Sequence, residues 1–134
     1  MSLPSHCDLV IRGGTVVDGS NGASWVGDVG ISGDRIVGIG DLSGASAARE
    51  VDATGRVVAP GFIDVHTHDD HLLIDGPDLA PKLSQGVTTV ITGNCGISLA
   101  PLRPGRQLPR DFDLLGDIDD KRFDRFGDYL DRLD

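Results

Sequence analysis

The stretch VVAPGFIDVHTHDDH, residues 57–71, joins a short apolar run to a cluster of histidines and aspartates. Three of the four residues 62–65 are apolar and follow a Pro-Gly pair, which is typical of a buried strand in a parallel sheet. Because side chains alternate along a strand, His66 and His68 are expected on one face, ~6.6 Å apart at ~3.3 Å per residue. Two imidazoles so placed can converge on a metal ion. A solvated histidine-rich loop after a strand is the alternative interpretation.

A second predicted strand leads to Cys95. Residues 87–92 are β-branched at all six positions, which indicates a strand. Between the strands, residues 75–85 are predicted to form one helix, with Pro77 near its first turn. Such a strand–helix–strand unit has a right-handed crossover and parallel strands. The carboxyl ends of both strands then lie at one edge, so we expect Cys95 beside the two histidines.

Shorter signals fill the rest of the chain. Residues 9–17 are expected to form two short strands around a Gly-Gly pair, and residues 25–39 a hairpin with its turn at Gly33. Residues 41–48 are predicted to be a loop, and residues 51–58 a second hairpin.

The C-terminal segment is predicted to be a loop followed by a helix. Residues 101–120 are rich in Pro, Arg, Gly and Asp, which favours an extended loop. Phe123, Phe126, Leu130 and Leu133 then follow one apolar stripe of a helix.

Three segments resemble the amidohydrolase superfamily. Residues 61–68 (GFIDVHTH) are similar to its first barrel strand, and residues 78–90 (DLAPKLSQGVTTV) continue the similarity. Residues 93–102 (GNCGISLAPL) resemble, more specifically, the N-acyl-D-amino-acid deacylases, or D-aminoacylases. The similarity covers about residues 8–101, and it is a similarity to the N-terminal portion of such an enzyme.

This resemblance implies a composite α/β architecture. Residues 1–59 would be the N-terminal part of a small β-sandwich domain. Residues 60–134 would be the first βα units of a metal-dependent hydrolase barrel of the (β/α)8, TIM-like type. A complete barrel typically needs about 250 residues, so the barrel is expected to be truncated in a chain of 134 residues.

The resemblance also implies a metal site. In D-aminoacylases the residue that matches Cys95 binds zinc, and those that match His66 and His68 lie at a second, weaker metal position. Further histidines and a catalytic aspartate, the general base, are expected beyond Asp134. From the residues alone, Cys95 has three interpretations: a core cysteine, a nucleophile without an evident Cys–His–Asn order, or a thiolate ligand beside the two histidines. Asp64 shares strand parity with His66, and either orients a ligand or accepts backbone hydrogen bonds.

The implied activity is zinc-dependent hydrolysis of an N-acyl-D-amino acid to a D-amino acid and a carboxylate. We expect a chain of this length to be inactive alone. One alternative is a cyclic amide hydrolase of the hydantoinase or dihydropyrimidinase type, although those enzymes usually hold a carboxylated lysine in place of the cysteine. The other is an inactive metal-binding fragment.

Four other polar residues are assigned no ligand role. His71 is expected at a surface or pocket rim, beyond the strand, and His6 in a disordered terminus. Asp69 and Asp70 are adjacent on an extended chain, so their carboxylates should diverge instead of sharing a proton.

Composition excludes some partners. Twelve basic against 21 acidic residues give a net charge of −9, which argues against nucleic acid. No apolar run approaches the ~20 residues of a membrane helix, so no membrane partner is expected.

Two cysteines cannot form a disulfide framework, although a single Cys7–Cys95 bridge stays open. With no secretory signal pattern, a cytoplasmic location is expected. The expected partner is a small-molecule substrate, and the sequence does not predict the oligomeric state.

Overall fold

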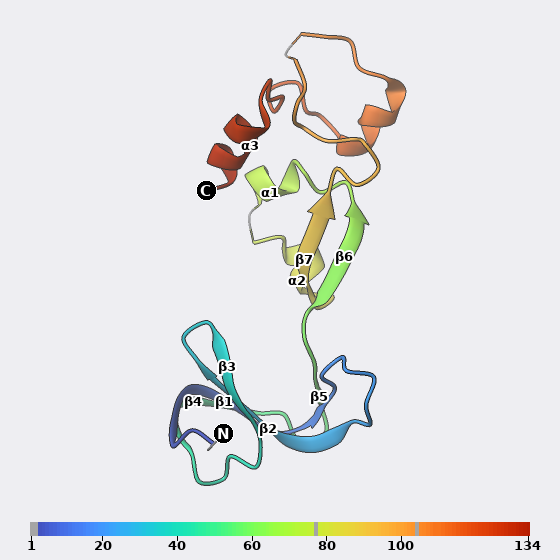
Figure 1. Ribbon diagram of the computed structural model, residues 1–134. Coiled ribbons are helices and arrows are strands. Elements are labelled where there is room, and N and C mark those ends of the chain that lie inside the picture. Colours follow the sequence, from blue (N-terminus) through green and yellow to red (C-terminus); the bar gives the residue numbers. More distant parts are fainter. Residues whose placement is uncertain (1–2, 77, 104) are drawn as a thin grey trace. The chain divides into compact units, whose positions relative to one another are not determined.

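The computed structural model describes residues 3–76, 78–103 and 105–134 (Figure 1). The chain divides into two compact units, one ending at Pro60 and the other beginning at Gly61. Within the described residues, no helix combines the length and the apolar character that crossing a membrane requires.

The first unit is built around one long central strand. It contains a five-stranded sheet with β1 paired on both edges. The strands are β1 (His6–Val16), β2 (Trp25–Ser32), β3 (Arg35–Gly40), β4 (Ser46–Asp52) and β5 (Val57–Val58). Strands β1, β2 and β3 are successively antiparallel, and this confirms the predicted hairpin over residues 25–39. Both β4 and β5 run parallel to β1.

Four sequence predictions for this unit are wrong. Residues 9–17 do not form two strands, because β1 continues through the Gly-Gly pair with a register shift between Ile11 and Gly14. His6 is ordered at the start of β1, where its Nδ1 lies 2.9 Å from Ser46 Oγ. The third wrong prediction is the loop over residues 41–48, because strand β4 already begins at Ser46.

The predicted hairpin over residues 51–58 is also wrong. A turn does form there, with Gly55 at φ 72° and the Arg56 N–H donating to Ala53 O at 2.9 Å. It steers the chain back alongside β1, so β5 pairs with Thr15 and Val16 in parallel. A local turn signal does not decide which strand the chain meets next.

The hydrophobic core of the first unit includes residues of the sheet itself. Cys7 and Val10 of β1 pack with Leu42 and Ala45, which lie just before β4. A Cβ on Gly30 would lie 2.8 Å from Cys7 Sγ and 2.9 Å from Leu42 Cδ1, so only glycine fits there.

A polar contact fixes this arrangement. The Asp28 carboxylate accepts the N–H groups of Gly13 at 2.9 Å and Leu42 at 3.2 Å. Arg12 donates to the carbonyls of Leu42 at 2.7 Å and Ala45 at 2.9 Å. The β1 register shift and the Leu42 loop are therefore held together by one ion-paired network.

The second unit contains the strand–helix–strand segment. Strands β6 (Phe62–Thr67) and β7 (Val87–Thr92) form a two-stranded parallel sheet, which confirms the predicted pairing. The single helix predicted over 75–85 is wrong: α1 (Leu72–Asp75) and α2 (Ala80–Leu83) are separate turns. Leu79 has a left-handed backbone with φ 41°, which prevents continuous helix. Pro77, assigned to the first turn, falls outside the described residues.

The hydrophobic core of the second unit is formed by residues that follow its sheet in the sequence. Leu99, Ala100, Leu115, Ile118 and Tyr129 are buried together. Leu115 ends a 3₁₀ helix, η1 (Arg110–Leu115), inside the segment predicted to be a loop. Helix α3 (Phe126–Leu133) confirms a helix near the C-terminus, but its buried residue is Tyr129, not a member of the predicted stripe.

Candidate metal centre

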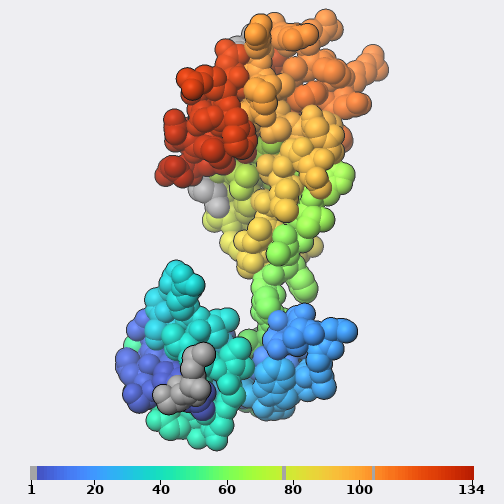
Figure 2. Space-filling model, in the orientation of Figure 1, coloured from blue at the N-terminus to red at the C-terminus, as the bar shows by residue number. Residues whose placement is uncertain are grey.

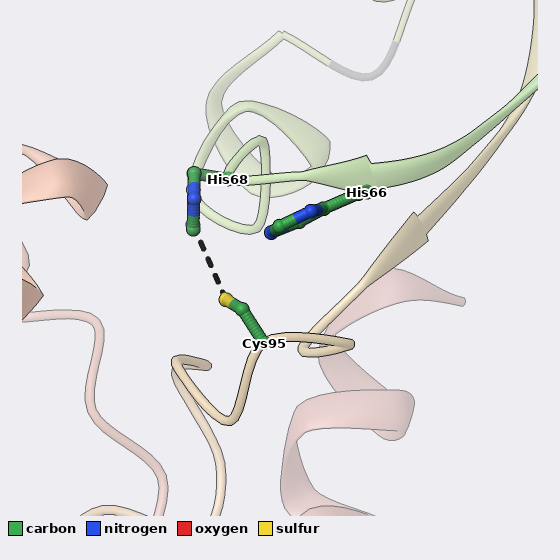
Figure 3. Close-up of side chains that lie close together, drawn as sticks. All are labelled: His66, His68 and Cys95. Atoms are coloured by element: carbon green, nitrogen blue, oxygen red, sulfur yellow. Dashed lines mark hydrogen bonds between the residues drawn. The ribbon is translucent and has the colours of Figure 1, made fainter.

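Three predicted site residues meet at one end of the β6–β7 sheet. Each of His66, His68 and Cys95 offers a ligand atom, and the three atoms lie within 4.8 Å of one another. Cys95 Sγ is 3.8 Å from His68 Nδ1, and the two imidazole centroids are 5.5 Å apart. Figure 3 shows the three side chains facing a common space, with the histidines at the end of β6 and Cys95 in the loop after β7. This is the only such group of His, Cys, Asp or Glu side chains in the part of the chain that the structure describes.

The cysteine loop is a tight turn tied to the neighbouring strand. Gly93 and Gly96 have φ values of 71° and 85°, which favour glycine, and the Gly96 N–H donates to Gly93 O at 2.9 Å. The Asn94 side-chain amide donates to Val65 O at 2.8 Å. The loop is therefore fastened to β6 one residue before His66, which brings the thiol near the imidazoles.

A lysine that the sequence interpretation did not single out contacts residues that flank the two histidines. Lys82 Nζ is 2.6 Å from Asp64 Oδ2, 3.0 Å from Asp69 Oδ2 and 3.2 Å from Thr67 Oγ1. The hydrogen bond from Lys82 is the main reason that the pKa of Asp64 is lowered, and the same contact is the main reason that the pKa of Lys82 is raised. A signal existed, because Lys82 is one of only two lysines in the sequence and lies in a segment that resembles amidohydrolases.

Asp64 makes backbone and ion-pair contacts. Its Oδ1 accepts the backbone N–H of His66 at 3.2 Å, while its Oδ2 faces Lys82. Of the two alternatives from the sequence, the contact to a backbone donor is present in the structure.

The remaining polar residues are separate from the three-residue group. Asp69 faces Lys82, whereas Asp70 is fully buried and accepts a hydrogen bond from Ser98 Oγ at 2.8 Å, so the two carboxylates diverge as expected. His71 lies half-buried just before α1. Both Cys7 and Cys95 are free, so the Cys7–Cys95 bridge is absent.

The donor set fits a transition metal. Tetrahedral zinc, with Zn–N of about 2.0–2.1 Å and Zn–S of about 2.3 Å, separates its ligand atoms by roughly 3.3–3.8 Å. The 3.8 Å between Cys95 Sγ and His68 Nδ1 meets this requirement. The ligand atoms of the whole group lie within 4.8 Å of one another, close enough for the three residues to share a metal centre. A thiolate with two imidazoles is a borderline-soft set that suits zinc.

Comparison with known proteins supplies a family context. Residues 49–122 match the model of the amidohydrolase family. A D-aminoacylase of Alcaligenes xylosoxydans xylosoxydans is 58% identical over 126 residues, which are 94% of this chain and 26% of that protein. The chain thus spans about a quarter of the length of this relative.

Two solved structures share the fold over 95% of this chain. One is a D-aminoacylase studied for the role of its binuclear metal centre, with a TM-score of 0.88, 55% identity and 27% of that chain covered. The other is the N-acyl-D-glutamate deacylase of Bordetella bronchiseptica, complexed with zinc and a phosphonate inhibitor that mimics the tetrahedral intermediate. Its TM-score is 0.87, with 41% identity and 26% of that chain covered.

Proposed function

This chain belongs to the amidohydrolase family, and we propose that it forms part of the zinc site of an enzyme that hydrolyses N-acyl-D-amino acids. The observation that carries the proposal is the meeting of one thiol with two imidazoles, within 4.8 Å, at the carboxyl ends of two parallel strands. Carboxyl ends of parallel strands are where α/β enzymes place their chemistry.

The relatives supply the substrate class of the proposal. The matched proteins are named D-aminoacylase and N-acyl-D-glutamate deacylase, and both act on N-acylated D-amino acids by name. Their fold agreement also supports the finer architecture: residues 1–59 as part of a small β-sandwich and residues 60–134 as the first units of a (β/α)8 barrel.

His66, His68 and Cys95 are proposed as the metal ligands. When bound, zinc polarises the acyl carbonyl and lowers the pKa of water to about 7. The protein's own contribution is to hold two neutral imidazoles and one thiolate at fixed separations. Asp64 orients His66 through the backbone N–H, and Asn94 holds the cysteine loop against β6. His66 and Cys95 are exposed, so substrate can reach the site.

Metal binding by residues 1–134 is the first test. We expect Co²⁺ to bind with a thiolate-to-cobalt charge-transfer absorption, which Cys95→Ala removes. Cys7→Ala is the matched control, because Cys7 is the second free thiol and is buried in the first unit. Binding that is unchanged by Cys95→Ala would contradict the proposed ligand.

Activity is best tested in a chimera. Residues 1–134 would replace the matching quarter of the Alcaligenes D-aminoacylase, and hydrolysis of N-acetyl-D-methionine and its L-form would be measured. We expect D-selective hydrolysis that Cys95→Ala abolishes, and no turnover by residues 1–134 alone. A folded, zinc-loaded chimera without activity would overturn the proposal.

A further inference from the structure

We propose that Lys82 is a positioning residue that clamps the segment carrying both metal histidines. The inference rests on the proposed metal site and adds a residue to it. Lys82 belongs to α2, between the two strands, and does not belong to the three-residue ligand group. Its role would be to hold the backbone around His66 and His68 so that their imidazoles stay within reach of one metal centre.

The clamp has two ends. Asp64 lies two residues before His66, and Asp69 lies one residue after His68. The Lys82 ammonium contacts both carboxylates, at 2.6 Å to Asp64 and 3.0 Å to Asp69. One cation therefore joins the two boundaries of the histidine segment, where β6 ends and the chain turns toward α1.

Each end is also connected to the segment itself. Asp64 Oδ1 accepts the backbone N–H of His66 at 3.2 Å, so the residue that Lys82 holds is bonded to a ligand residue. At the other end, Thr67 Oγ1 donates to Asp69 Oδ2 at 2.5 Å and lies 3.2 Å from Lys82 Nζ. Three residues of the segment, Asp64, Thr67 and Asp69, contact Lys82. Both histidines are therefore next to, or two residues from, a residue that Lys82 holds.

Burial makes these contacts effective. The side chains of Lys82, Asp64 and Asp69 are 23%, 29% and 15% exposed. Partly buried pairs are less screened by solvent and salt than surface pairs. The exposed apolar residues of β6, by contrast, supply little packing around the histidines. Outer residues that orient metal ligands typically contribute 10–100-fold to metal affinity.

A purely structural ion pair is the competing explanation. It would stabilise the second unit without changing how the ligands meet the metal. Lys121 offers a matched control, since its side chain is 21% exposed and its Nζ pairs with Asp75 Oδ2 at 3.1 Å in the same unit. The Asp75 pair does not flank the histidines.

The experiment measures Co²⁺ affinity and the Co²⁺ absorption spectrum of residues 1–134, with far-ultraviolet circular dichroism as the check of folding. We expect Lys82→Met to weaken Co²⁺ binding about 10–100-fold and to change the ligand-field bands. Lys82→Arg keeps the cation and should recover most of the affinity. Lys121→Met should leave both the affinity and the bands unchanged.

A second variant, Asp69→Asn, tests the clamp if Lys82→Met does not fold. It removes the charge at one end of the clamp and preserves the side-chain volume. We expect a smaller loss of affinity and the same direction of spectral change. Normal affinity and bands in a folded Lys82→Met or Asp69→Asn variant would overturn the clamp, and equal losses in Lys121→Met would do the same. Absence of Co²⁺ binding by the unmodified chain would instead overturn the metal site, and the clamp with it.

Discussion

The two sheets of this chain are stabilised in different ways. In the first unit, β1 is paired on both edges and carries buried Cys7 and Val10. In the second, β6 and β7 pair with each other, and the apolar side chains of β6 are exposed: Phe62 by 65%, Ile63 by 61% and Val65 by 57%. The space-filling view shows the atoms of β6, in green, at the surface of that unit (Figure 2).

The comparison shows that one sheet contributes to a hydrophobic core, whereas the other carries the candidate metal site. The first unit has its core on its sheet, and no metal-type cluster is found among its described residues. The second unit has its core in the later segment around Leu115 and Tyr129, while its sheet bears the site. Around the site, polar contacts such as those of Asn94 and Lys82 take the place that apolar packing has in the first unit.

The largest effect is expected in the core of the second unit. Leu115 is fully buried, whereas its neighbour Leu114 is 60% exposed. Leu115→Ala should lower the free energy of unfolding by about 2–5 kcal/mol, since it leaves a cavity. Leu114→Ala should change it by less than about 0.5 kcal/mol. Urea unfolding followed by the single tyrosine, Tyr129, measures both, and equal losses would place the core elsewhere.

A smaller loss is expected from the polar network of the first unit. Asp28→Ala removes the acceptor for the N–H groups of Gly13 and Leu42, so roughly 1–3 kcal/mol should be lost. Fluorescence of the only tryptophan, Trp25, follows this unit during urea unfolding. Asp34→Ala is the control, because Asp34 is 87% exposed. If the Asp28 variant were as stable as the control, the polar contacts would be dispensable and apolar packing alone would hold the sheet.

Alkaline pH should weaken the second unit through Tyr129. Burial, followed by the charge of Asp70, raises the pKa of its phenol. The folded chain therefore holds this proton more tightly than the unfolded chain. Stability should be complete below pH ~10, the ordinary tyrosine pKa, and fall as pH rises through the folded pKa. Tyrosinate absorbance should show a higher midpoint in buffer than in urea; equal midpoints would rule out a buried phenol.

The smallest effect is expected on the strand that bears the site. Ile63→Thr should change the free energy of unfolding by about 0.5 kcal/mol or less, because the side chain is already 61% exposed. The equivalent change in β1, Val10→Thr, buries a hydroxyl and should cost roughly 1–3 kcal/mol. Urea unfolding of the two variants compares the sheets directly. A loss at Ile63 as large as that at Val10 would remove the contrast between them.

The parts that the sequence predicted depend on local rules. Strand periodicity put His66 and His68 on one face, and the parallel crossover put Cys95 at the same edge; the structure brings all three together. Six successive β-branched residues fixed β7, and its bounds agree with the prediction.

The parts that it missed depend on long-range contacts. The partner of β5 is β1, more than 40 positions earlier, and no turn signal near Gly55 could reveal it. The cluster around Leu99 and Leu115 buries Tyr129 of α3. Of the predicted apolar stripe, Phe123 packs against this cluster, whereas the other members are exposed: Phe126, Leu130 and Leu133. The sequence marks Lys82 as one of two lysines, but its contacts with Asp64 and Asp69 form only in the folded chain.

The central strand β1 also sets an order for folding. Its pairing with β2 is local, since Val16 lies opposite Trp25. Its other edge needs Ser46 opposite His6 and Val57 opposite Thr15, about 40 residues later in each case. Closing such long loops is slower than forming a hairpin. During synthesis, we therefore expect the β1–β2 hairpin to form first and β1 to keep an unpaired edge until residue 58 has left the ribosome. We expect this interval to be the period in which the nascent chain most needs a chaperone.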